Sequence, residues 1–182
     1  MRDAPSCGVD MNDWNELWRS TWLAEGHSGE TYRDYSIEAN ASRYDSRRDL
    51  WEEAEARSSI LEVDGRSVID VGSGPGMLTL PMARRARRVT AVEPSERMID
   101  LLRGHLEQEG LENVDIVNDR WEDVEGLEQH DVVVASLSLL MLDLRAALER
   151  MDALARMRVY LIWFVGTSPW ERIRLELSLI HI

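Results

Sequence analysis

Residues 68–76 read Val68-Ile69-Asp70-Val71-Gly72-Ser73-Gly74-Pro75-Gly76, an apolar run that ends in a glycine-rich turn. The residues that follow, from Met77 to Arg85, have the spacing of a helix. Glycines let the backbone approach a ligand closely because no Cβ intervenes, and the N-terminus of a following helix favours an anionic group. The pattern indicates a ligand site, although a tight strand-to-helix connection without a ligand uses the same residue types.

The spacing around the turn narrows the class of ligand. A dinucleotide fingerprint, G-x-G-x-x-G, requires glycine at position 77, where this chain has Met77. Glu93 lies 21 residues beyond Gly72, at the end of the next apolar run, where a carboxylate can accept both ribose hydroxyls. Asp70 stands two residues before the first glycine and can meet an ammonium group. Together these residues favour a nucleoside that carries an amino acid over one that carries a pyrophosphate.

From residue 67 onward, short apolar runs alternate with amphipathic segments. This alternation is typical of a parallel sheet with right-handed crossover helices. We expect a doubly wound α/β fold with strand order 3-2-1-4-5, preceded by N-terminal helices. The expected strands are 67–71, 89–92, 114–117, 131–135 and 159–165, and the expected helices are 77–85, 95–109 and 144–156.

The composition argues against several other classes of protein. The chain has 182 residues, of which 44% are hydrophobic and 30% charged, so a globular domain is expected rather than a disordered chain. Its net charge of −13 disfavours a nucleic-acid partner, because an acidic surface repels phosphate backbones. Every basic residue is arginine, which excludes a Schiff-base lysine and a P-loop lysine.

Metal sites and membrane segments are not predicted either. One cysteine and four scattered histidines offer no metal-ligand spacing. No apolar run approaches the roughly 18 residues of a membrane-spanning helix, and the N-terminus lacks the pattern of a secretory signal. We therefore expect a cytoplasmic protein with no membrane partner.

With these motifs, the chain resembles the class I S-adenosylmethionine-dependent methyltransferases. The resemblance runs from about Tyr44 to Gly166 and rests on residues 68–76, on VTAVEPSERM at 89–98, and more weakly on NVDIVNDRWEDV at 113–124 and HDVVVASLSLL at 130–140. It implies S-adenosylmethionine as the cofactor, laid across the carboxyl ends of the strands, with the glycine turn around its methionine portion and Glu93 at its ribose. The residues expected at this cofactor are Tyr44, Asp70, Gly72, Ser73, Gly74, Gly76, Glu93, Pro94, Met98, Trp121 and Ser136.

The position that contacts adenine departs from the family pattern. Family members often carry an acidic residue after the third strand, which accepts a hydrogen bond from the adenine amino group. Alignment on EDV at 122–124 puts Arg120 at that position and Asp119 one place earlier. Either the register slips by one residue, or adenine is held mostly by backbone and packing, with Trp121 flanking it. Trp121 and Met98, which the resemblance places near adenine, also fit ordinary core positions.

The carboxyl end of the fourth strand bears on the methyl acceptor. Family enzymes that methylate exocyclic amines of nucleic acids or glutamine amides carry an Asn/Asp-Pro-Pro-aromatic tetrapeptide there. This chain reads Ala135-Ser136-Leu137-Ser138 instead, which argues against those acceptors. Ser136 is expected to line the cofactor site, because ligands bind at this edge of open α/β sheets, whereas Ser138 fits a helix cap equally well.

The N-terminal part is rich in aromatic residues. We expect a flexible extension at 1–10, a helical region at 11–62 and the α/β domain at 63–182. Trp14, Trp18 and Trp22 share one face of a helix, a glycine-containing break follows at 26–29, and a second helix is expected over 42–61. These helices are either a mobile lid that excludes water, with Tyr44 near the methionine portion, or packing elements at the sheet edge.

The C-terminal residues and the function complete the expectations. Members of the family add an antiparallel hairpin after the fifth strand; we expect it to be missing or truncated here, and Trp170–Leu179 has the pattern of the start of a helix. The expected activity is methyl transfer to a small-molecule acceptor, which depends on in-line positioning more than on a strong base, so no catalytic residue is singled out. The alternatives are a non-catalytic S-adenosylmethionine-binding or interaction protein and a nucleic-acid methyltransferase.

Overall fold

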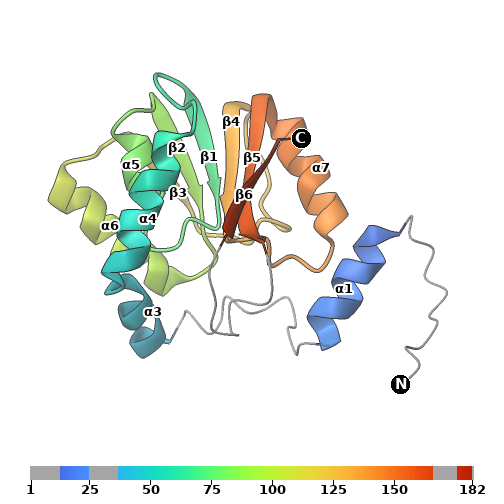
Figure 1. Ribbon diagram of the computed structural model, residues 1–182. Coiled ribbons are helices and arrows are strands. Elements are labelled where there is room, and N and C mark those ends of the chain that lie inside the picture. The colour runs from blue at the N-terminus through green and yellow to red at the C-terminus, as the bar shows by residue number, and fades with distance from the viewer. Residues whose placement is uncertain (1–12, 25–36, 166–175, 182) are drawn as a thin grey trace.

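The computed structural model describes residues 13–24, 37–165 and 176–181 (Figure 1). The expected extension at 1–10 and the break at 26–29 lie outside these residues. The helices are α1 (Trp14–Ala24), α3 (Glu38–Asp45), α4 (Arg48–Ser59), α5 (Thr79–Ala83), α6 (Glu96–Glu109) and α7 (Leu144–Leu154). The strands are β1 (Ser67–Val71), β2 (Arg88–Val92), β3 (Val114–Val117), β4 (His130–Ser136), β5 (Ala155–Val165) and β6 (Glu176–His181).

The strands form one sheet with the order β3-β2-β1-β4-β5-β6. The first five are parallel in the order 3-2-1-4-5, which confirms the predicted doubly wound fold. β6 pairs antiparallel with β5, so the described residues contain one strand after β5 rather than the two of a hairpin. Its residues 176–179 correct the prediction of a helix over Trp170–Leu179, whose first six residues lie outside the described ranges.

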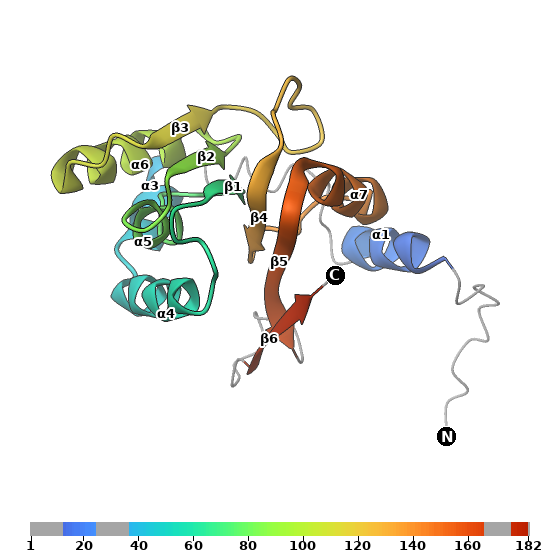
Figure 2. The ribbon, with the colours of Figure 1, turned by 90° about the horizontal axis from the view of Figure 1, so that it is seen from above.

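Helices cover both faces of the sheet, as the view from above shows (Figure 2). β1 is buried along its whole length, and its successive residues serve opposite faces. Ile69 and Val71 pack into the core beneath α7, together with Val133 and Met151. Val68 points to the other face and packs with residues of α5 and of the segment before β1. The two cores fix β1 in the middle of the molecule, and its carboxyl end with it.

Local signals explain why the helix after β2 was predictable. The side chain of Ser95 accepts a hydrogen bond from the backbone N–H of Met98, which caps α6 at its first turn. Gly110 ends the helix. Met98, Leu102 and Leu106 recur at the spacing of one buried face between these two signals. α6 therefore agrees with the predicted range to within one residue.

The helix predicted over 42–61 is two helices. α3 ends at Asp45 and α4 begins at Arg48, although the corner contains neither proline nor glycine. The indole N–H of Trp51 in α4 donates to the carbonyl oxygen of Asp45 at 2.8 Å, which ties the two helices together across the corner. The helix predicted over 77–85 is also shorter, because α5 spans only Thr79–Ala83.

α1 packs at the other end of the sheet, beside α7 (Figure 1). The ring of Trp18 lies 5.3 Å from that of Trp22, and 6.1 Å from that of Trp163 in β5. The Trp18 indole N–H also donates to the carbonyl oxygen of Met141 at 2.9 Å. α1 thus contacts the segment between β4 and α7.

None of the helices within the described ranges has both the length and the apolar character needed to cross a membrane.

Candidate functional site

The strand register brings three functional segments to one edge of the sheet. Val71 pairs with Val92 on one side and with Ala135 on the other. Each of these residues is followed by a residue expected at the cofactor, namely Gly72, Glu93 and Ser136. These three residues therefore lie side by side at the carboxyl ends of the strands. Open α/β sheets bind their ligands at this edge.

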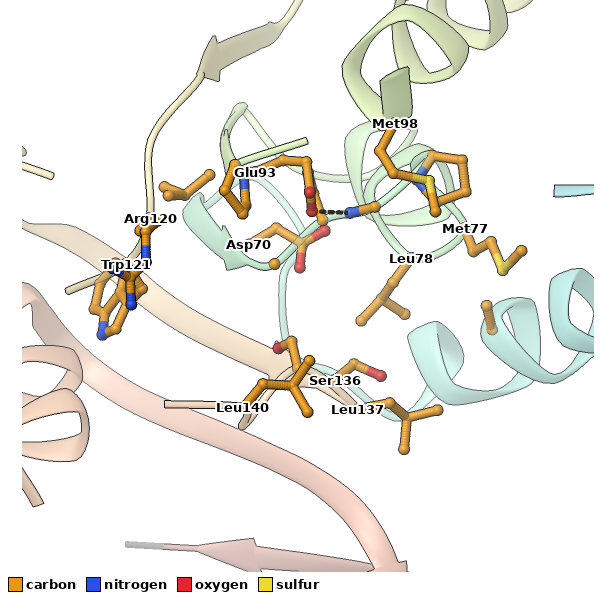
Figure 3. Close-up of a pocket in the computed structure, with 18 of the residues that line it drawn as sticks. Asp70, Met77, Leu78, Glu93, Met98, Arg120, Trp121, Ser136, Leu137 and Leu140 are labelled. Carbon is orange, nitrogen blue, oxygen red and sulfur yellow. Dashed lines mark hydrogen bonds between the residues drawn. The ribbon is translucent and has the colours of Figure 1, made fainter. Parts of the chain in front are cut away.

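A cavity lies at this edge, and it brings together ten of the eleven residues expected at a cofactor (Figure 3). Asp70 and Glu93 stand at its centre, Arg120 and Trp121 lie to one side, and Met77 and Leu78 lie to the other. The ten residues that line it are Tyr44, Asp70, Gly72, Ser73, Gly74, Glu93, Pro94, Met98, Trp121 and Ser136.

Gly76 is the one expected residue outside the lining. Its φ is +96°, and a Cβ there would lie 2.5 Å from a terminal methyl carbon of Leu102 and 2.6 Å from one of Leu80. The glycine therefore lets the turn pack closely against α5 and α6. In this structure Gly76 lies on the side of the turn that faces α5 and α6, and it does not line the cavity.

The backbone N–H groups of the glycine turn, residues 72–76, all donate to acceptors within the protein. Those of Gly72 and Ser73 donate to the carbonyl oxygen of Val92 at 2.8 and 3.2 Å, and that of Gly76 donates to the carbonyl oxygen of Ser73 at 3.1 Å. The N–H of Gly74 donates to Oε2 of Glu93 at 2.9 Å, and Pro75 has no N–H. The turn therefore has no N–H group left over to hold a pyrophosphate.

Glu93 is buried beside this turn. Its Oε2 accepts the N–H of Gly74, and its Oε1 accepts the N–H of Ser95 at 2.9 Å. Burial raises the pKa of the Glu93 carboxyl to about 7, and these two hydrogen bonds oppose the rise. Each oxygen keeps an acceptor lone pair for a ligand hydroxyl.

Asp70 is the second buried carboxyl group of the cavity, at the end of β1. Its Oδ2 accepts the hydroxyl of Thr79, the first residue of α5, at 2.6 Å. Burial raises the pKa of Asp70 to about 6, against the effect of that hydrogen bond. Asp70 also raises the pKa of Glu93 through charge repulsion. Two neighbouring buried carboxylates gain from a ligand that brings positive charge and hydroxyl donors.

After β3, the residue that lines the cavity is Arg120 and not Asp119. The side chain of Asp119 accepts the backbone N–H of Arg120 at 2.8 Å. The guanidinium of Arg120 donates to Glu122 at 2.9 Å, and Glu122 also lines the cavity. An arginine–glutamate pair thus lies where family members often have an acidic residue.

Trp121 occupies a core position at the edge of the cavity. Trp121 lines the cavity, yet it is 3% exposed and belongs to the core beneath α7. Its indole N–H donates to the carbonyl oxygen of Ala147 at 3.1 Å. The ring is therefore fixed by packing, and one part of it remains available to a ligand.

The opposite wall follows β4. We call Ser136, Leu137, Ser138, Leu140 and Met141 the β4 wall, and three of its five members are apolar. Leu137 has φ +58°, a left-handed conformation that is unfavourable for a residue with a Cβ. Such strain is often found at ligand sites, where the surrounding structure holds the residue in place.

Arg57 is a cavity residue that sequence reasoning missed. It lies in the last turn of α4, it is 8% exposed, and it lines the cavity near Tyr44 and Ala54. The helix carries several charged residues with no motif around them, so nothing in the local sequence marks one arginine as buried. Its place is set by how α4 packs against α5.

Within the described ranges, no group of three or more His, Cys, Asp or Glu side chains is arranged to hold a metal ion.

The comparisons with known proteins agree with this geometry. The model of a family described as a methyltransferase domain matches residues 68–157. Residues 68–157 belong to the class I S-adenosylmethionine-dependent methyltransferases. That family uses S-adenosylmethionine as its methyl donor, as the resemblance implied.

Three relatives illustrate the range of this methyltransferase domain. A ubiquinone biosynthesis O-methyltransferase from Cereibacter sphaeroides is 36% identical over 102 residues, which are 56% of this chain and 37% of that protein. A ribosomal RNA small subunit methyltransferase G from Pseudarthrobacter chlorophenolicus is 35% identical over 91 residues, 47% of this chain and 42% of that protein. The structure of coclaurine N-methyltransferase, bound to N-methylheliamine and S-adenosylhomocysteine (SAH), is 25% identical, with a TM-score of 0.53 over 63% of this chain and 35% of that one.

The chain covers between 19% and 42% of the length of eight curated relatives that it matches.

Proposed function

We propose that this methyltransferase binds S-adenosylmethionine in the cavity and transfers its methyl group to a small molecule. The observation that carries the proposal is the pairing of two buried carboxyl groups, Asp70 and Glu93, beside a turn with no N–H left over. A pyrophosphate would add negative charge to these carboxylates and would find no backbone donors. A ribose with two hydroxyls, joined to a cationic amino acid, suits the same groups.

Each residue then has a role that its position supports. Glu93 accepts the ribose hydroxyls, Asp70 faces the ammonium group, and the glycine turn encloses the methionine portion. Pro94, Met98 and Trp121 supply the apolar surface for adenine, with the Arg120–Glu122 pair at its edge. Tyr44 and Ser136 contribute to the lining from the α3 side and from the end of β4.

Methyl transfer from S-adenosylmethionine needs little acid–base catalysis by the protein. When bound, S-adenosylmethionine supplies a methyl group on a positively charged sulfur. The residues of this chain hold the reactants in line and keep water away, and such positioning accounts for a large part of the rate. The mostly apolar β4 wall is suited to this role because its only hydroxyl groups are those of Ser136 and of Ser138, which donates to the carbonyl oxygen of Val71.

A small molecule is the favoured acceptor. The cavity is lined by apolar side chains of the β4 wall together with Met77 and Leu78, as is typical of small-molecule sites. The net charge of −13 opposes an approach to RNA, although relatives of this domain include ribosomal RNA methyltransferases. The single cysteine in the chain favours action in the cytoplasm.

Calorimetry with SAH tests cofactor binding. Glu93→Ala should weaken SAH binding by about 1.5–3 kcal/mol, the scale of a hydrogen bond to a charged group. Glu96→Ala is a matched control, because Glu96 is an exposed carboxylate three residues away. Tight binding of NAD without any binding of SAH would overturn the proposal.

A second experiment identifies the acceptor class. Incubation with S-adenosylmethionine labelled on the methyl group, once with a metabolite extract and once with RNA, should transfer label to the extract. Transfer to RNA alone would favour a nucleic-acid methyltransferase. Cofactor binding without transfer to either would favour a non-catalytic binding protein.

A further inference from the structure

The sequence contains a basic run, Arg-Arg-Ala-Arg-Arg at 84–88, for which the proposed function has no role. Its first two arginines each donate two hydrogen bonds to a carboxylate, that of Glu109 and that of Asp64 respectively. The side chain of its third arginine, Arg87, is 65% exposed and lies 3.7 Å from Oδ2 of Asp131. In the part of the chain that the structure describes, the Arg87 guanidinium donates no hydrogen bond, so its donors are available to another molecule.

Asp131, near the start of β4, is shared by a second arginine. Its Oδ2 already accepts the N–H and the hydroxyl of Ser67, at 2.8 and 2.9 Å, and its Oδ1 lies 3.8 Å from Nη1 of Arg156. The hydrogen bonds from Ser67, and then the two arginines, hold the pKa of Asp131 below its usual range, so the carboxylate is ionised. Arg87 and Arg156 are too far from it for a hydrogen bond, and exposed pairs of this kind contribute little to stability.

A β-bulge places an apolar side chain beside these charges. The pairing of β4 with β5 shifts by one residue between His130 and Val132, so Arg156 and Met157 together stand opposite Asp131. A bulge of this kind redirects the side chains around it. Met157 is 51% exposed as a result, although β5 is a strand of the sheet's interior.

A third arginine completes the cluster. Nη1 of Arg66 donates to Sδ of Met157 at 2.8 Å, and sulfur is only a weak acceptor. We call Arg66, Arg87, Arg156 and Met157 the arginine surface. Three guanidinium groups and one carboxylate, that of Asp131, gather here, which leaves two positive charges in excess on a chain whose net charge is −13.

The neighbouring arginines do not add to this excess. Arg88 pairs with Glu128 at 3.4 Å, and Arg158 pairs with Glu62 at 2.5 Å. The positive charge is therefore confined to the arginine surface.

The arginine surface lies at the amino ends of the strands, whereas the cavity lies at their carboxyl ends. The five residues of β1 separate the two edges by about 16 Å. A molecule bound at the arginine surface is therefore neither the cofactor nor the methyl acceptor held in the cavity.

We propose that the arginine surface is a docking site for an acidic segment of a partner protein. Carboxylates of such a segment can accept the guanidinium donors, and an apolar side chain between them can pack on Met157. Arginine and methionine are both enriched in protein–protein interfaces. A nucleic acid suits the surface less well, because its charge continues beyond the cluster over a chain that is acidic as a whole, and because Met157 offers bases no aromatic face.

The test uses the fluorescein-labelled peptide Glu-Glu-Leu-Glu-Glu, with binding followed by fluorescence anisotropy at low ionic strength. Arg87→Met and Arg156→Met keep much of the side-chain volume and remove the guanidinium. Each should weaken peptide binding by about 3–10-fold, the scale of a hydrogen bond to a charged group.

Arg103→Met is the matched control. The Arg103 side chain is 64% exposed and lies 3.5 Å from Asp100, which is nearly the exposure and the pairing distance of Arg87. The control changes the net charge by the same amount, so it separates docking at the arginine surface from general attraction between charges. Arg103→Met should alter peptide affinity by less than twofold.

A second comparison tests the apolar part of the surface without changing any charge. The wild type should bind Glu-Glu-Leu-Glu-Glu about 3–5-fold more tightly than Glu-Glu-Ser-Glu-Glu, because only leucine can pack on an apolar side chain. Met157→Ser should remove this preference. The midpoint of thermal unfolding should stay the same in all four variants, because the substituted side chains are all at least half exposed.

Three results would overturn the proposal. The first is the absence of peptide binding by the wild type, and the second is an equal loss of affinity in Arg103→Met and in the two arginine-surface variants. The third is tighter binding of a twelve-nucleotide single-stranded RNA than of the peptide, weakened by Arg87→Met and Arg156→Met, which would identify a nucleic-acid surface instead. None of these measurements involves S-adenosylmethionine or SAH, so they do not depend on the proposed function.

Discussion

The two walls of the cavity are built on different principles. The wall made by the ends of β1 and β2 is polar, and its turn, residues 72–76, satisfies its own N–H groups. The β4 wall is mostly apolar and contains the left-handed Leu137. Both walls are held by hydrogen bonds to the sheet, in the second through the N–H of Leu137, which donates to the carbonyl oxygen of Ile162 at 2.9 Å. The second wall also contacts a neighbouring helix, because Trp18 of α1 donates to the carbonyl oxygen of Met141.

This difference suggests that one wall binds the cofactor and the other wall binds the methyl acceptor. The polar wall presents carboxylates and a preformed turn, which suit a ligand that the whole family shares. The β4 wall presents apolar surface whose shape depends on α1, which precedes the matched domain. The acceptor is therefore expected to depend on the β4 wall and on α1, and the following experiments perturb one wall at a time.

The largest effect is expected from pH, and it concerns the polar wall. With pKa values of about 7 for Glu93 and about 6 for Asp70, both groups must lose a proton before they accept hydroxyl and ammonium donors. Binding of SAH should therefore weaken as pH falls, by about 1,000-fold between pH 8 and pH 5, since each proton contributes tenfold per pH unit below its pKa. Calorimetry across this range measures the effect.

The substitution Glu93→Gln distinguishes the titration of Glu93 from that of Asp70. The amide removes the titration near pH 7, so the remaining pH dependence should begin near pH 6 and reach about 10-fold at pH 5. The amide has one acceptor oxygen, so the N–H of Gly74 or that of Ser95 loses its acceptor, and the affinity of the variant is therefore compared with its own value at each pH. An affinity that does not change with pH would exclude ionised carboxylates as the binding groups.

The next largest effect concerns the contact between the walls. Gly72 has φ +69°, and a Cβ there would lie 2.5 Å from the Cβ of Ser138 in the β4 wall. Gly72→Ala should lower the free energy of unfolding by about 3 kcal/mol, through the left-handed conformation and through displacement of Ser138. Gly74→Ala is the control: its φ is +56° but no atom lies within 4 Å of the added Cβ, so about 1 kcal/mol is expected in urea titrations. Equal losses would mean that the walls are not in tight contact.

The same contrast explains what the sequence could predict. The turn, Glu93 and the cap of α6 are local patterns, so their positions follow from spacing alone. The corner between α3 and α4 was missed because it depends on the hydrogen bond from Trp51 to Asp45, which no proline or glycine announces. Arg57 was missed for a related reason, since only the packing of α4 on α5 turns a charged helix residue into a buried one.

A smaller effect is expected from the support of the β4 wall. Trp18→Phe removes the indole donor and leaves the carbonyl oxygen of Met141 without that partner, so the free energy of unfolding should fall by about 2 kcal/mol. SAH affinity should remain within about twofold, because no α1 residue lines the cavity in the described ranges. Trp14→Phe is the control, since Trp14 is 40% exposed and contacts Arg145 through its ring face. A marked loss of SAH affinity in Trp18→Phe alone would show that α1 supports both walls.

The smallest effect lies at the opposite edge of the sheet, at the start of β4. Nδ1 of His130 lies 2.9 Å from the carbonyl oxygen of Glu128, so Nδ1 carries the proton there, and Nε2 then accepts the hydroxyl of Thr90 at 2.9 Å. Burial lowers the pKa of His130 below its usual value of about 6.5, and the folded state therefore binds fewer protons than the unfolded state. The stability from His130 is complete above pH 6.5 and declines as pH falls through the interval below it. The raised pKa values of Asp70 and Glu93 act in the opposite direction, so the pH dependence of the total stability does not isolate the contribution of the histidine.

The measurement that isolates His130 is the difference in unfolding free energy between the wild type and His130→Gln, taken at pH 7 and at pH 5. It should shrink at pH 5, and a difference that stays constant would mean that His130 does not titrate within this range in either state.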